Sequence, residues 1–248
     1  MPARPATEDR GRSPADFAAI LAGADPLFLV GGQAVNLWAL CYPERTGHLA
    51  PFVSRDIDVL GDRDTLSRIA KTAGVPAQFF PLRPPTNEIG IVMVTGTDGS
   101  PLPVEVLSHV HGIGNEELCR PTYTLTVGEG GVKVHVPGPV ALLQAKIANA
   151  ADLPQAGRQD GRHVHILTQV MPGYLGDLLA TVTAGRLDQR GMLDLLERLL
   201  TVIASRQARR VMEELGICRQ SLFAELNPPL PAKLHAFVTQ RLPRILGT

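Results

Sequence analysis

The chain has 248 residues, of which 44% are hydrophobic and 19% charged, the balance of a globular protein with a sizeable core. Its 24 acidic and 24 basic residues give a formal net charge of zero, which excludes a general electrostatic attraction to nucleic acid or anionic lipid. Three widely spaced cysteines indicate neither a disulfide framework nor a zinc site. The sequence shows no secretory signal and no apolar run of roughly 20 residues, so we expect a cytoplasmic protein with no membrane association.

The chain is expected to begin with a flexible tail over residues 1–12, followed by a helix that Ser13 caps and Pro14 opens. A short buried strand comes next, and it breaks at Gly31 and Gly32 into a second helix. The expected buried face of that helix consists of Ala34, Leu37, Trp38 and Cys41.

Two carboxylates follow an irregular connection that is predicted for residues 42–53. Residues 54–60 read as a strand in which alternation sends Asp56 and Asp58 to one side, while the apolar residues between them face the core. Paired carboxylates repel strongly unless a cation lies between them. Mg²⁺ is commonly held by one or two carboxylates together with substrate phosphates, so the pair predicts a metal and nucleotide site.

A β-hairpin offers a third carboxylate. A helix is predicted over 64–72, and the hairpin arms are predicted over 89–95 and 103–107. Glu105 stands between two valines of the second arm and therefore points away from the face that those valines bury. One further strand is predicted over 132–136.

Beyond residue 138 the sequence changes to helical patterns, which separates an α/β domain over 13–138 from a helical domain over 139–248. The expected fold class is α/β (α+β), with a mixed β-sheet flanked by helices and followed by a C-terminal helical bundle. Helices are expected over 140–151, 162–170, 175–184, 187–215 and 231–246.

Three features follow one another along the chain: two glycines at a strand-to-helix turn, Asp-x-Asp on the next strand and a lone acid on a later strand. The residues are Gly31, Gly32, Asp56, Asp58 and Glu105. In this order the chain resembles the DNA polymerase beta-like nucleotidyltransferase superfamily, and most closely its minimal and abortive-infection, toxin-like branch, over roughly two-thirds of its length. The resemblance implies that the α/β domain is a catalytic domain with the nucleotidyltransferase fold. It implies that the glycine turn holds the nucleotide phosphates, that the Asp-x-Asp pair binds two Mg²⁺ ions and that the third acid completes the catalytic metal site.

The resemblance also implies further nucleotide-binding residues. Gln33 lies at the first helical turn, near the phosphates, and Ser54 begins the aspartate strand. Lys146 fits the lysine that contacts the triphosphate in the toxin-like branch. Arg158-Gln159-Asp160, with His163, resembles a weakened form of the Lys-Asp-x-x-Asp cluster of relatives, and Arg158 is assigned to the nucleotide.

One spacing departs from the family pattern. The interval from Gly32 to Asp56 is about 24 residues, against roughly a dozen in relatives. Either an insertion over 48–52 accounts for the difference, or the glycine turn lies elsewhere. We favour the insertion, which would lie beside the nucleotide site and could shape the acceptor site.

The leading hypothesis is Mg²⁺-dependent transfer of a nucleoside monophosphate from an NTP to a hydroxyl of tRNA, protein or a small molecule, by a toxin with a cognate antitoxin. One alternative is a catalytically silent nucleotide-binding or interaction module of the same fold. Another is an antibiotic-modifying nucleotidyltransferase, which would need an acidic acceptor cleft. Four C-terminal arginines either form a solvated helix face or bind an acidic acceptor such as RNA: Arg206, Arg209, Arg210 and Arg219.

Overall fold

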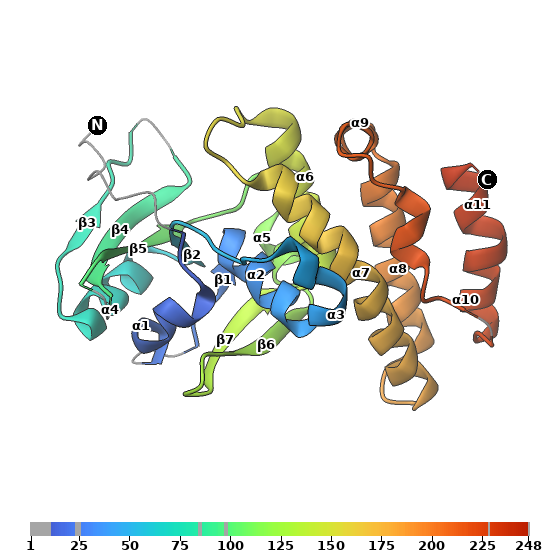
Figure 1. Ribbon diagram of the computed structural model, residues 1–248, viewed down its shortest axis with the longest axis horizontal. Coiled ribbons are helices and arrows are strands. Elements are labelled where there is room, and N and C mark those ends of the chain that lie inside the picture. Colours follow the sequence, from blue (N-terminus) through green and yellow to red (C-terminus); the bar gives the residue numbers. More distant parts are fainter. Residues whose placement is uncertain (1–10, 23–25, 84–85, 97–98, 228, 248) are drawn as a thin grey trace. The chain divides into compact units, whose positions relative to one another are not determined.

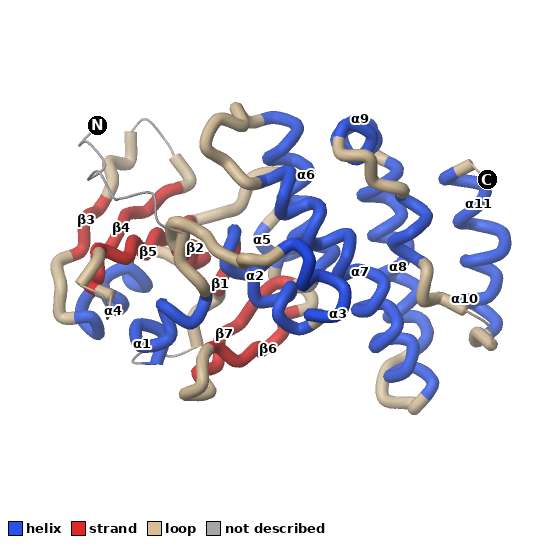
Figure 2. Tube along the Cα trace, viewed as in Figure 1, coloured by secondary structure: helices blue, strands red, loops and turns tan. Residues whose placement is uncertain are grey.

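The structure, a computed structural model, describes residues 11–22, 26–83, 86–96, 99–227 and 229–247. Contacts divide the chain into two compact units (Figures 1 and 2). The first unit comprises residues up to 37 together with 49–138, and the second comprises 38–48 together with 139–248.

The predicted tail over 1–12 lies mostly outside the described residues. Its last residue, Arg12, is an exception that corrects the prediction. Arg12 is 8% exposed and forms an antiparallel bridge with Ser54, so it belongs to the first unit rather than to a tail. The predicted hairpin turn at 97–100 also lies partly outside the described residues.

A mixed sheet forms the centre of the first unit, which confirms the predicted fold class (Figure 2). Among the described residues it has five strands in the order β1, β2, β5, β4, β3. The pair β2 and β5 is parallel, and the other neighbouring strands are antiparallel. The strands are β1 (Leu29–Val30), β2 (Ile57–Leu60), β3 (Ala77–Phe79), β4 (Glu88–Thr95) and β5 (Pro101–Leu107).

A second, two-stranded sheet lies in the same unit and consists of β6 (Thr122–Val127) and β7 (Val132–Pro137). The strand β7 was predicted and β6 was not, although the threonines of β6 alternate with larger side chains in a pattern typical of strands. The chain also has a short helix α5 (Asn115–Leu118) and the strand β3, for which the sequence analysis made no prediction.

Two helices of the first unit begin within one residue of the positions that the sequence predicts. Ser13 precedes the 3-10 helix η1 (Pro14–Phe17), which continues into α1 (Ala18–Ala22). The backbone N–H of Ser13 donates to the Asp16 carboxylate at 2.7 Å, a reciprocal capping contact. The helix α4 (Arg63–Ala73) buries Leu66, Ile69 and Ala70 and ends at Gly74, whose φ is +67°.

The second unit is helical and contains the end of α2, a helix that runs over Gly31–Cys41 and so begins in the first unit. Among the described helices of both units, none is at once long and apolar enough to span a bilayer. The remaining helical segments of this unit are α3 (Pro43–Thr46), η2 (Gly47–Leu49), α6 (Pro139–Asp152), α7 (Asp160–Thr183), α8 (Gln189–Ala204), α9 (Arg206–Glu214), η3 (Arg219–Phe223), α10 (Ala232–Ala236), the π-helical turn η4 (Phe237–Arg241) and α11 (Leu242–Leu246).

Two helix boundaries in this unit differ from the prediction. The helix α7 runs unbroken through Pro172, where we expected two helices, because twelve buried side chains along its length outweigh the loss of one backbone hydrogen bond at the proline. Conversely, the single helix expected over 187–215 is interrupted at Ser205. There the backbone is extended, with ψ at 155°, and the Ser205 hydroxyl accepts a bond from the N–H of Ala208 to begin α9.

The connection over 42–53 is also more ordered than predicted, since it contains α3 and η2. The hydroxyl of Tyr42 donates to Asp177 of α7 at 2.9 Å, and Arg45 pairs with Glu225 at 2.6 Å. These contacts explain why residues 38–48 join the second unit. On α2 itself, Trp38 is buried as predicted and packs edge-on against Tyr174, whereas Cys41 is exposed instead of buried.

Two glycines of α7 provide a matched test of this packing. A Cβ on Gly173 would lie 2.7 Å from a ring carbon of Tyr42, whereas a Cβ on Gly176 would lie 3.4 Å from Glu225, an ordinary contact. We expect Gly173→Ala to lower the free energy of unfolding by about 1–3 kcal/mol through overpacking. Gly176→Ala should instead raise it by up to about 1 kcal/mol, since alanine favours helix. Urea denaturation of both variants measures the difference, and equal effects would contradict the observed packing.

Candidate functional site

The turn between β1 and α2 fits one carboxylate closely. Val30 is the register partner of Asp58 on β2, and Gly31 begins α2 with φ at +64°, a backbone conformation that glycine adopts readily. A Cβ on Gly31 would overlap Oδ2 of Asp58 and would lie 2.7 Å from its Cγ. The glycine is therefore required by shape as well as by backbone conformation, because the Asp58 carboxylate occupies the space beside it.

Asp58 and Glu105 are side by side. The strands β2 and β5 run parallel, and their register pairs Asp58 with Glu105 directly. The residues on either side of both acids are buried valines and isoleucine, so the two carboxylates project from the opposite face of the sheet. Glu105 is 6% exposed, while Asp58 is half-buried. The sheet thus brings together two of the three predicted acids.

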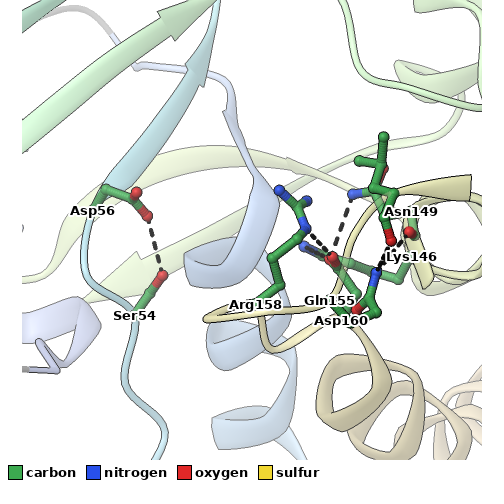
Figure 3. A network of polar contacts seen from close by, with 8 residues as sticks. Ser54, Asp56, Lys146, Asn149, Gln155, Arg158 and Asp160 are labelled. Carbon is green, nitrogen blue, oxygen red and sulfur yellow. Dashed lines mark hydrogen bonds and ion pairs between the residues drawn. The ribbon is translucent and has the colours of Figure 1, made fainter. Parts of the chain in front are cut away.

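The third predicted acid, Asp56, lies just before β2 rather than within it. Its Oδ1 accepts a hydrogen bond from the Ser54 hydroxyl at 3.3 Å, as Figure 3 shows. Within the described ranges, no three acidic, histidine or cysteine side chains converge closely enough to form a ready-made metal cluster. Two neighbouring carboxylates completed by phosphate oxygens nevertheless make a suitable ligand set for Mg²⁺, which favours oxygen donors.

Gln33 and Ser54, both predicted to contact nucleotide, are held by Arg12. The Gln33 side chain is 1% exposed, and its Nε2 donates to the carbonyl of Arg12 at 3.0 Å. The backbone of Ser54 exchanges two hydrogen bonds with the backbone of Arg12, at 2.7 and 2.9 Å. Arg12 is a residue that the sequence analysis missed, since an arginine near the start of a chain carries no motif that would distinguish it.

The predicted cation Lys146 lies on α6 in the second unit, where it belongs to a buried network (Figure 3). Its Nζ contacts Oδ1 of Asp160 at 3.0 Å, and Nε of Arg158 contacts Oδ2 of the same carboxylate at 2.6 Å. Asn149, which the sequence analysis did not single out, donates to Oδ1 at 3.4 Å. The side chains of Lys146 and Asp160 are 9% and 2% exposed, whereas that of Arg158 is 38% exposed.

Charge balance sets the protonation of this network. Burial by itself would raise the pKa of Asp160, but the positive charge of Lys146 and the hydrogen bond from Arg158 outweigh it, so the pKa lies below its usual value. For His163, burial and the charge of Lys146 together hold the pKa well below 6.5. Among the described residues neither ring nitrogen of His163 has a hydrogen-bond partner, and with its pKa lowered the imidazole is neutral near pH 7.

Three of the four C-terminal arginines bind backbone carbonyl groups. Arg209 donates to Ala204, Arg210 to Ala151 and Arg219 to Ile203, at 2.9, 2.8 and 3.4 Å. All three bonds lie within the second unit. These arginines therefore have a structural role in joining helix ends, whether or not they also contact an acceptor.

The close fit between Gly31 and Asp58 yields a prediction about stability. Gly31→Ala should lower the free energy of unfolding by about 1–3 kcal/mol, because the substitution both strains the backbone and displaces the carboxylate. Gly130→Ala is the matched control, since Gly130 is exposed, does not have a positive φ and has nothing within 4 Å of an added Cβ. Thermal and urea unfolding measure both variants, and a Gly31→Ala protein as stable as the control would contradict the geometry.

His163 yields a prediction about pH. Its pKa is depressed in the folded protein, so below about pH 6.5 the unfolded chain binds a proton that the folded protein does not, and stability falls as the pH falls. Between pH 7 and 5.5 the loss should be about 1 kcal/mol, and it should disappear in His163→Gln. His165→Gln, on the same helix and partly exposed, should retain it. Urea denaturation across this pH range is the measurement, and a slope that survives in His163→Gln would contradict the assignment.

Comparison with known proteins gives a limited result. No protein-family model matches the chain, and no curated protein matches it significantly. Among solved structures the chain is similar to an antigenic nucleotidyltransferase-like protein from Paracoccidioides brasiliensis, with 16% sequence identity and a TM-score of 0.38. That similarity covers 78% of this chain and 86% of the other.

Proposed function

We propose that this protein catalyses the metal-dependent transfer of a nucleoside monophosphate from an NTP to an acceptor hydroxyl, with release of pyrophosphate. One observation carries the proposal: the sheet register sets Asp58 beside Glu105 and packs the same Asp58 against Gly31, where α2 begins. The carboxylates that would hold cations and the helix start that would hold phosphates are thereby adjacent.

The chain's own groups suit a triphosphate at this position. The first backbone N–H groups of a helix have no partner within that helix and favour anions, and α2 is eleven residues long. Gly31 and Gly32 are the first two residues of this helix, and neither carries a side chain. A phosphate here would be repelled by Asp58 unless a cation lay between them, so binding of the nucleotide and of the metal would be coupled.

Asp56, Asp58 and Glu105 would hold Mg²⁺, and the bound metal would lower the cost of negative charge that develops on the transferring phosphoryl group. Glu105 is buried in the central strand β5, whose pairing with β4 fixes its position. A carboxylate held in this way would orient the acceptor hydroxyl. Ser54 would fix the Asp56 carboxylate through their hydrogen bond. Catalysis of this kind depends mainly on positioning and charge stabilisation.

Lys146 and Arg158 remain predicted nucleotide ligands. Both cations already contact Asp160, so a phosphate would compete with that carboxylate for them. Arg158 is the better candidate of the two, because its side chain is 38% exposed while that of Lys146 is 9% exposed. The acceptor is tRNA, protein or a small molecule, and the labelling experiment below distinguishes these three classes.

Label transfer from α-³²P NTPs tests the proposed reaction. Each of the four NTPs is incubated with Mg²⁺ and with total tRNA, cell protein or small-molecule fractions. We expect the wild-type protein to label one fraction and Asp58→Asn to lower the rate by about a hundredfold or more, since it removes a metal-binding charge. Asp64→Asn, an exposed site on α4, is the matched control and should leave the rate unchanged.

The controls separate the possible results. Circular dichroism checks that each variant is folded, so that a loss of transfer is not mistaken for a loss of structure. Equal label with wild type and Asp58→Asn would exclude the proposed site. If NTP binds with Mg²⁺ but labels no fraction, the result would favour the catalytically silent binding module.

A further inference from the structure

One residue near the start of the described chain contacts all three segments that carry the proposed site. The backbone N–H of Arg12 donates to the carbonyl of Ser54 at 2.7 Å, and the backbone N–H of Ser54 donates back at 2.9 Å. The Gln33 side chain donates to the Arg12 carbonyl at 3.0 Å. The Arg12 guanidinium donates to the hydroxyl of Ser100.

Each of these partners lies next to a predicted functional group. Ser54 is two residues before Asp56 and donates to its carboxylate. Gln33 is in the first turn of α2, which begins at Gly31. Ser100 immediately precedes β5, the strand that carries Glu105. Arg12 therefore links the approach to β2, the start of α2 and the start of β5.

The contacts of Arg12 with Ser54 and with Gln33 are buried. Arg12 is 8% exposed, Ser54 is 9% exposed and Gln33 is 1% exposed. The chain also approaches closely just before Arg12, since a Cβ on Gly11 would lie 2.5 Å from Cγ2 of Val53. A buried backbone group that loses its hydrogen-bond partner is unfavourable, so the segment is held in place.

We propose that Arg12 and Gln33 are positioning residues that set the geometry of the carboxylate site. This inference rests on the proposed function. In it Gln33 acts through the Arg12 carbonyl and not by contact with a nucleotide phosphate. Arg12 acts chiefly through its backbone, which fixes Ser54 and, through the Ser54 hydroxyl, the Asp56 carboxylate.

The test is to titrate the full-length protein with Mn²⁺ in the absence of nucleotide. The electron paramagnetic resonance signal of free Mn²⁺ measures how much of the metal remains unbound. Arg12→Ala and Arg12→Pro both remove the guanidinium, but only the proline also removes the N–H that bonds to Ser54. Arg12→Pro should weaken Mn²⁺ binding about tenfold or more, as loss of groups that orient metal ligands commonly does. Arg12→Ala should have a smaller effect. Ser13→Ala is the control, because the Ser13 hydroxyl bonds to Asp16, and it should bind as wild type does.

Gln33→Met separates positioning from nucleotide contact. It keeps the side-chain volume and removes the amide, so it should weaken Mn²⁺ binding in the absence of nucleotide. In the double variant Arg12→Pro/Gln33→Met it should add less than it does alone, since both changes weaken one chain of contacts. If Gln33 instead contacts phosphate directly, Gln33→Met will leave Mn²⁺ binding unchanged and weaken only nucleotide binding.

Melting curves distinguish positioning from general stability. Variants that melt earlier yet bind Mn²⁺ as tightly as wild type would overturn the inference while leaving the proposed function intact. Independent, multiplicative effects in the double variant would overturn the role of Gln33. If the wild-type protein binds Mn²⁺ only together with an NTP, the variants are compared with that NTP present. If it binds no Mn²⁺ even then, the proposed function itself fails and this inference fails with it.

Discussion

The packing of the Asp58 carboxylate against Gly31 is the constraint on which the rest of the site depends. It fixes the distance between the end of β1 and the middle of β2, and it leaves room for no side chain other than hydrogen at position 31. Because β2 also pairs with β5, the register of that pair sets Glu105 beside the same Asp58. A shift of one residue in either strand pairing would send one acid to the opposite face of the sheet and separate the pair.

The elements that carry this site were predictable because each has a strong local signal. The glycine turn, the alternation around Asp58 and the valines around Glu105 specify a helix start and two strand faces without any long-range information. The sequence also predicted the hairpin of β4 and β5. What alternation cannot give is the order of strands in the sheet, so the parallel pairing of β2 with β5 became known only from the structure.

The unpredicted parts depend on tertiary contacts. Two helices were predicted over 162–170 and 175–184, yet α7 continues through Pro172, where buried neighbours stabilise both sides. The role of Arg12 could not be predicted either. Its contacts with Ser54 and Gln33 are made by backbone groups, which do not depend on the type of side chain. Lys146 was correctly placed on a helix, but its pairing with Asp160 depends on the packing of α6 against α7.

The path of the chain at α2 has a consequence for its modularity. Residues 38–48 lie in sequence between two segments of the first unit but pack with the helices that follow residue 138. The second unit is therefore discontinuous, and cutting the chain at residue 138 would separate Tyr42 and Arg45 from Asp177 and Glu225. A fragment meant to contain the whole second unit would therefore have to include residues 38–48 as well as the helices after residue 138.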